Sequence, residues 1–275
     1  MRFRTGCCAI SAATTCLVFA QPAHAERPED KAWLQAGAFF PTFDSTAQID
    51  VPDTSIDGTV IDFERDLDLA KRKTVPDIEG GLRITNRLRL EGGFFSLKRN
   101  GETKLDRDIR WEETIYPATA DVKSGFRTDI YRVAVGYSFV KSPNLEVGAR
   151  IGAHVTDFKM FIEGNGTVDG ETILLKNEAK NRTIPLPNVG LYANANLSRV
   201  FTVSGGANWF QLKVDDYKGR LIDLSAGVSA RVLPHVGIGV RYRYVDYTLH
   251  AKASDWEGRV DYTFHGPAVF LEAAF

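Results

Sequence analysis

The sequence predicts an all-β chain that closes into a single antiparallel transmembrane β-barrel, most simply of ten strands, with eight as the alternative. Three observations predict this fold: an export signal at the N-terminus, ten segments in which apolar and polar residues alternate, and connections that alternate strictly between short and long. Each of the three has its own physical basis.

The first 25 residues have the order of a cleaved secretory signal. Arg2 and Arg4 supply its basic start, an apolar stretch follows, and the segment ends on Ala23-His24-Ala25. The apolar part is too short to span a bilayer as a helix. We therefore expect residues 1–25 to be removed and the mature domain to comprise residues 26–275.

All the cysteines of the chain lie in the signal segment, at Cys7, Cys8 and Cys16. The mature chain therefore has no cysteine, although export takes it to a compartment where small domains often rely on disulfides. A disulfide framework, a thiolate metal site and a thiol nucleophile are all excluded.

The charge and hydropathy patterns exclude two further classes of protein. Removing Arg2 and Arg4 from the 34 basic residues leaves 32 against 35 acidic ones, so no excess of positive charge indicates nucleic-acid binding. After the signal there is no run of about 18 apolar residues that could form a membrane-spanning helix. A membrane could be crossed only by strands.

The alternating segments and their connections define the barrel. Four connections are tight, near 85–87, 141–144, 198–199 and 233–235, and the others are longer and polar, near 42–74, 99–126, 158–185, 213–218 and 248–261. Outer-membrane barrels have short periplasmic turns and long extracellular loops. The expected strands are 31–41, 75–84, 87–98, 127–140, 145–157, 186–198, 200–212, 219–232, 235–247 and 262–275.

Alternation assigns a face to each residue, because successive side chains of a strand point to opposite sides. The fourth segment has one face with aromatic residues at both ends, Tyr131 and Phe139, and valines between them. The eight residue steps between them cover roughly 26 Å along the strand, or about 20 Å once it tilts by about 40°. This is close to the height of a lipid-facing band between two aromatic girdles.

The last strand resembles the insertion signal of Gram-negative outer-membrane proteins. The chain ends on Phe275, and Val269, Leu271 and Ala273 lie on the same face before it. The resemblance implies that the barrel-assembly machinery recognises this strand, that outer-membrane lipid surrounds the barrel, and that the protein resides in the outer membrane.

A second resemblance extends over most of the mature chain. The run Gly58–Leu67 before a proline-led strand, followed by Asn86–Glu91, resembles an uncharacterised family of proteobacterial porin-like barrel proteins. The resemblance implies a barrel and carries no known activity.

The inward faces of the strands carry charge of both signs in near balance. Unpaired charges in a narrow lumen are costly, so we expect them to pair, for example Glu146 with Arg241. Four more charged residues, Asp77, Glu79, Asp223 and Arg231, share these faces. The expected lumen network is Arg83, Arg89, Glu91, Arg132, Glu146, Arg150, Arg241, Arg243 and Glu272.

Three functions are compatible with this pattern. The favoured one is an outer-membrane barrel with a structural or surface-exposed role, and a narrow pore is compatible with this function. The first alternative is an enzyme at the extracellular rim, a protease or lipid hydrolase, and the second is a soluble periplasmic barrel that binds a ligand. No Gly-x-Ser-x-Gly motif or Asp-x-His pair occurs, so we expect no enzyme, and no metal or cofactor. The oligomeric state is left open.

Overall fold

The computed structural model describes residues 30–51, 57–111, 114–168, 171–214, 217–253 and 256–275, so the predicted signal segment lies outside it. These residues include no helix long and apolar enough to cross a membrane. The strands are β1 (Ala32–Phe39), β2 (Thr42–Asp50), β3 (Ile61–Asp62), β4 (Val75–Arg83), β5 (Leu88–Lys104), β6 (Ile109–Trp111), β7 (Thr114–Tyr116), β8 (Asp121–Lys141), β9 (Leu145–Val168), β10 (Glu171–Asn196), β11 (Phe201–Val214), β12 (Tyr217–Leu233), β13 (Val236–Ala253) and β14 (Trp256–Ala274).

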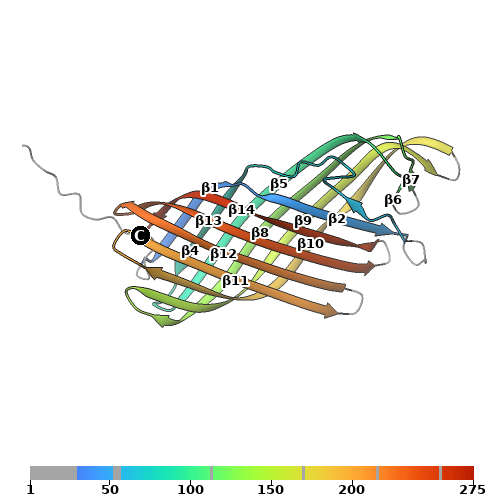
Figure 1. Cartoon of the computed structure of the whole chain (residues 1–275). Coiled ribbons are helices and arrows are strands. Elements are labelled where there is room, and N and C mark those ends of the chain that lie inside the picture. Colours follow the sequence, from blue (N-terminus) through green and yellow to red (C-terminus); the bar gives the residue numbers. More distant parts are fainter. Residues whose placement is uncertain (1–29, 52–56, 112–113, 169–170, 215–216, 254–255) are drawn as a thin grey trace, which may run out of the picture.

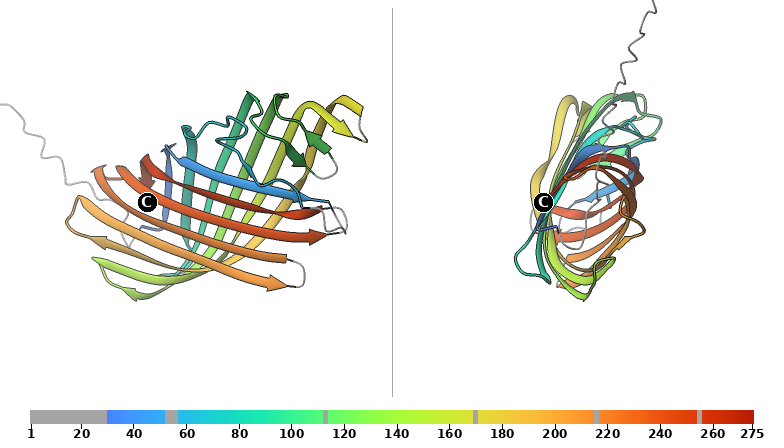
Figure 2. Two further views of the ribbon diagram at one scale, coloured as in Figure 1. Left: turned by 45° about the vertical axis from the view of Figure 1, so that its right-hand side comes forward. Right: turned by 90° about the vertical axis from the view of Figure 1, so that its left-hand side faces the viewer.

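Ten of these strands form a closed antiparallel ring. Its order is β1, β4, β5, β8, β9, β10, β11, β12, β13 and β14, and pairing of β1 with β14 closes it. The tilted strands and the ring are seen from the side and obliquely in Figures 1 and 2. The ten-strand prediction is confirmed, and the eight-strand alternative is wrong.

Short turns join neighbouring strands at one end of the barrel, at residues 84–87, 142–144, 197–200 and 234–235, as the sequence predicts. We call this the turn end and the opposite one the loop end. Toward the loop end the strands continue much further than expected. Large parts of 99–126 and 158–185, assigned to loops from the sequence, instead extend β5, β8, β9 and β10.

Part-way along the strands, the polar and apolar residues exchange faces, and β8 shows this most clearly. Near the turn end Tyr131 and Phe139 point outward with about half of their surface exposed, while Arg132 points inward. Two residues before Tyr131 the outward face becomes polar with Asp129, and the inward face becomes apolar with Ile130, which is 3% exposed. We call the two parts of the barrel the turn half and the loop half.

The turn half carries a continuous outward band of apolar side chains, as expected for a lipid-facing surface. The loop half has an apolar interior instead, in which aromatic rings pack with centroids 5.2–6.5 Å apart. We call this interior cluster the aromatic plug. It comprises Phe39, Phe43, Phe95, Phe126, Phe158, Tyr247, Tyr262 and Phe264.

One part of the wall is not made by a ring strand. β1 and β2 lie along β14 in one register, but they are interrupted at Pro41, which has no backbone N–H to donate. β4 begins at Val75, which pairs with Phe39, so β4 is absent from the wall on the loop-end side of Pro41. There, residues 57–74 fill the space between β2 and β5. The Oγ of Ser124 donates to the carbonyl oxygen of Leu67 (3.3 Å), and a Cβ on Gly101 would lie 2.1 Å from that same oxygen. Only glycine permits this close approach.

The outward band predicts a depth-dependent response to charge. We expect Val135→Arg, at the middle of the band, to lower the free energy of unfolding by about 2–4 kcal/mol, because the guanidinium would enter lipid. Asp121→Arg, on the same face of β8 in the loop half, is the control and should change it by less than about 1 kcal/mol. Equal effects in urea titrations of vesicle-refolded protein would contradict placement of the band in lipid.

Candidate functional site: the barrel lumen

The lumen of the turn half is the main candidate site, because it concentrates buried charge. All nine charged residues that the sequence assigns to a lumen network lie on inward faces of ring strands. The structure brings them together in two groups, one at mid-barrel and one near the turn end.

Glu79 on β4 is the centre of the mid-barrel group. Its carboxylate accepts hydrogen bonds from Arg132 (2.5 Å), from Arg243 (3.0 Å) and from Arg241. Asp77 lies 3.7 Å from both Arg132 and Arg241. Three cations and two carboxylates from β4, β8 and β13 therefore join facing sides of the barrel.

A second carboxylate, Asp223, extends the group across the lumen. Arg243 binds it through two nitrogens, at 2.6 and 3.0 Å, in a bidentate arrangement. The Nε2 atom of His154 lies 3.4 Å away, and the Nδ1 atom of the same ring is 3.0 Å from Asn188. Asp223 also accepts a hydrogen bond from Asn208 (3.3 Å).

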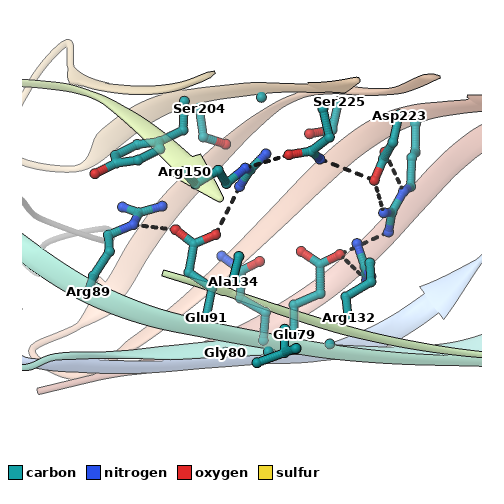
Figure 3. Close-up of a pocket in the computed structure, with 18 of the residues that line it drawn as sticks. Glu79, Gly80, Arg89, Glu91, Arg132, Ala134, Arg150, Ser204, Asp223 and Ser225 are labelled. Atoms are coloured by element: carbon teal, nitrogen blue, oxygen red, sulfur yellow. Dashed lines mark hydrogen bonds and ion pairs between the residues drawn. The ribbon is translucent and has the colours of Figure 1, made fainter. Parts of the chain in front are cut away.

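Arg150 connects Asn208 to the side of the lumen nearer the turn end. It donates to Asn208 (2.7 Å) and to Glu91 (2.9 Å), and Glu91 also pairs with Arg89. Figure 3 shows this chain of contacts from Arg89 to Arg132. The guanidinium of Arg89 lies over the ring of Tyr192, 3.8 Å from its centroid.

Glu146 is the centre of the group near the turn end. Arg83 binds both of its oxygens, at 2.7 and 2.6 Å, and Lys141 lies 3.6 Å away. The predicted pair of Glu146 with Arg241 is wrong, because Arg241 instead contacts Glu79 and Gln35. Strand tilt sets the depth of each side chain in the barrel, and it places these two at different levels.

Two further contacts close the turn end. Arg231 pairs with Asp30 (2.5 Å), and Gln35 donates to Glu272 (2.7 Å). All four residues are below 10% exposed. The buried polar groups at this end are therefore held by partners from strands on several sides.

A cavity of about 130 Å³ remains among the mid-barrel charges. Five arginines and three carboxylates line it, and glycines make room for two of the arginines. A Cβ on Gly206 would lie 2.6 Å from a nitrogen of Arg150, and one on Gly93 would lie 2.8 Å from Arg132. The space is polar and large enough for a few water molecules.

Arg99 is a charged residue that the sequence assigns to a loop and that the structure places inside the aromatic plug. Its side chain is fully buried and its guanidinium lies 4.7 Å from the ring centroid of Phe43 and 5.4 Å from that of Phe126. It pairs with Glu64 of the 57–74 segment and donates to the hydroxyl of Ser45 (2.7 Å). A cation held by rings and a carboxylate thus fixes the segment to the plug.

Several members of the lumen network were missed from sequence because they are uncharged or aromatic. Gln35, Tyr192 and Asn208 each alternate with exposed apolar residues such as Leu34, Leu191 and Trp209, and that alternation is the signal that could have found them. Arg99 could have been found by continuing the alternation of β5 past Lys98.

Comparison with known proteins decides the class of barrel. Residues 11–264 match the family described as the outer membrane protein β-barrel domain. The chain belongs to this family. Membership agrees with the closed ring and the outward apolar band, and it argues against a soluble periplasmic barrel. No curated protein matches the chain significantly.

Solved barrels similar to this member of the family have different activities. The Escherichia coli outer membrane protease OmpT aligns with a TM-score of 0.58 at 8% identity, over 91% of this chain and 99% of that chain. The Pseudomonas putida toluene transporter TodX (TM-score 0.37, 10% identity, 90% of each chain) and the Yersinia pestis attachment invasion locus protein Ail (0.31, 9%, 88% and 99%) also align. The likeness to OmpT shows the fold alone.

The observed pairing predicts which charges are energetically coupled. We expect a double-mutant cycle of Glu146→Gln with Arg83→Met to show a coupling energy of about 1–3 kcal/mol. A cycle of Glu146→Gln with Arg241→Met, which contact different partners, should be additive within about 0.5 kcal/mol. Urea unfolding of vesicle-refolded variants measures both, and the reverse ranking would show a different pairing in the membrane.

Proposed function

We propose that this outer-membrane barrel does not conduct and is not an enzyme, and that it anchors a folded β-structure on the cell surface. The observation that carries the proposal is that the lumen is filled at two levels. Ion pairs fill the turn half, and the aromatic plug with the 57–74 segment fills the loop half.

The two levels resist opening for different reasons. A permeating ion would have to displace paired charges, and removing one partner of a buried pair costs about 3–5 kcal/mol. In the loop half it would have to cross a layer of closely packed rings, six of which are phenylalanine. The mid-barrel cavity lies among these ion pairs and has no lining residue from the plug.

The 57–74 segment keeps the plug in place. Phe63 is fully buried with its ring 5.3 Å from Phe126, and Asp66 pairs with Arg107 (2.5 Å). Burial raises the pKa of Asp66, but hydrogen bonds from Arg65 and Arg107 outweigh it and hold this pKa below its ordinary value. The Asp66 carboxylate is therefore charged at neutral pH and keeps its partners.

The length of the strands supports a role at the surface. A membrane-spanning β-strand needs about 9–11 residues, whereas β9 has 24 and β10 has 26. With the turn end in the periplasm, more than half of each strand stands outside the cell. Beside this extension the β6–β7 hairpin buries Trp111 and Tyr116, so the surface part has a packed core of its own.

The described histidines favour a structural role over a rim enzyme. His154 is buried in the lumen, and His235 bonds to the backbone of Ala274 (2.9 Å) at the turn end. His265 contacts the Tyr242 hydroxyl (2.7 Å), and His250 lies beside Arg259 in the strand register. A general base on the rim would need a carboxylate or nucleophile beside it.

The sealed lumen predicts negligible conductance. In planar bilayers the wild-type protein should give no stable single-channel steps. A quadruple variant that opens both levels should leak, because paired charges and rings are removed together. Its substitutions are Glu79→Ala, Arg241→Ala, Phe126→Ala and Tyr262→Ala. Large stable steps from the unmodified barrel would overturn the proposal in favour of a pore.

We also propose that the barrel-assembly machinery recognises the C-terminal strand. Phe275 is 65% exposed on the outward face, and its ring stacks on that of His235 with centroids 5.0 Å apart. Deleting Phe275 should reduce the amount of heat-modifiable barrel in outer-membrane fractions while leaving signal cleavage unchanged, with His235→Ala as the matched control. Equal barrel levels for the deletion and the wild type would contradict this role.

A further inference from the structure

The outward surface of the loop half carries basic residues at a constant distance from the apolar band. On each of three neighbouring strands, β5, β8 and β9, a basic residue stands four positions beyond the residue at which the continuous apolar band ends. All three basic side chains are exposed. The pairs are Phe94 and Lys98, Tyr131 and Arg127, and Val155 and Lys159.

These basic residues lie side by side in the sheet. Lys98 is the register partner of Arg127, and Arg127 is the register partner of Lys159. Neighbouring strands are about 4.8 Å apart, and like charges directly opposite each other destabilise a sheet. Lys73 adds a fourth cation, because its Nζ donates to the carbonyl oxygen of Lys98. Folding alone does not account for such a row.

Acidic neighbours neutralise the row only in part. Between the row and the apolar band lie Asp129, which binds Arg127 (2.8 Å), and Asp157, which accepts a hydrogen bond from Thr183. Four cations therefore face two carboxylates. Within the described residues no ion pair is formed by Lys73, Lys98 or Lys159.

The height of the row above the apolar band matches a lipid headgroup. Four residues cover about 13 Å along a strand, or about 10 Å along the membrane normal at a tilt of about 40°. Polar headgroups extend about 5–8 Å beyond the hydrocarbon, within reach of a long basic side chain. The same spacing recurs across the ring, where Lys213 follows Trp209 and Lys218 precedes Ile222.

We propose that the row formed by Lys73, Lys98, Arg127 and Lys159 binds the phosphate groups of a phosphorylated lipid of the outer leaflet. Paired basic side chains at fixed spacing suit a headgroup that carries more than one phosphate. The acyl chains of the same lipid would lie against Phe94 and Tyr131, whose rings are 5.0 Å apart. The proposal requires the membrane placement of the band and is independent of whether the lumen conducts.

The test measures binding of diphosphoryl lipid A in detergent micelles to the refolded full-length barrel. Loss of two cations at a membrane surface should weaken binding about 25-fold, so Lys98→Gln/Lys159→Gln should show this loss. The control Lys104→Gln/Lys123→Gln removes two cations farther from the band, each within reach of an acid at 3.7 and 3.5 Å, and should bind like the wild type.

Three outcomes would overturn the proposal. Equal binding of dephosphorylated lipid A would show that acyl chains alone are recognised, and equal binding of inorganic phosphate would show a site for a free anion. An equal loss in the control variant would show only a general charge effect. Heat-modifiable migration checks that each variant folds, and Lys98→Arg/Lys159→Arg should retain binding if charge at these positions is what matters.

Discussion

The structure depends on one constraint: each strand passes through two environments, lipid and water, that require opposite polarities of its outward face. Inside a bilayer the outward face must be apolar and the inward face can hold charge, whereas outside it water requires the reverse. Because the two-residue period of a strand does not change, the chain meets both demands by exchanging side-chain types between its faces. On β8 this exchange occurs between Arg132 and Asp129.

This exchange explains why the interior is divided into two layers. The charged lumen is placed where the wall faces lipid, and the aromatic plug where the wall faces water, so each layer has the polarity opposite to its surroundings. Arg99 is the exception, a cation in the apolar layer. Its partners come from β2, β8, β14 and the 57–74 segment, so the surroundings of its charge are complete only when all four are assembled.

The sequence was a good guide to the turn half and a poor one to the loop half. Strand number, tight turns and the lipid face of β8 were predicted correctly, because alternation there follows the pattern of an apolar exterior. Beyond Asp129 the same alternation has its polarity reversed, and Phe126 was therefore assigned to a loop although it is a core residue. Pairing within the lumen was not predictable, because it depends on the tilt that sets the depth of Glu146 relative to Arg241.

The contact between Gln35 and Glu272 joins residues 237 positions apart in the chain. It belongs to the seam between β1 and β14, so the ring cannot close until the last strand is available. Contacts of such sequence separation form late, because the entropy of a long loop must be lost before they can contribute. Until then β1 and β14 both present unpaired edges, which are competent to pair with another chain. The period before closure is therefore when this chain most needs protection from aggregation.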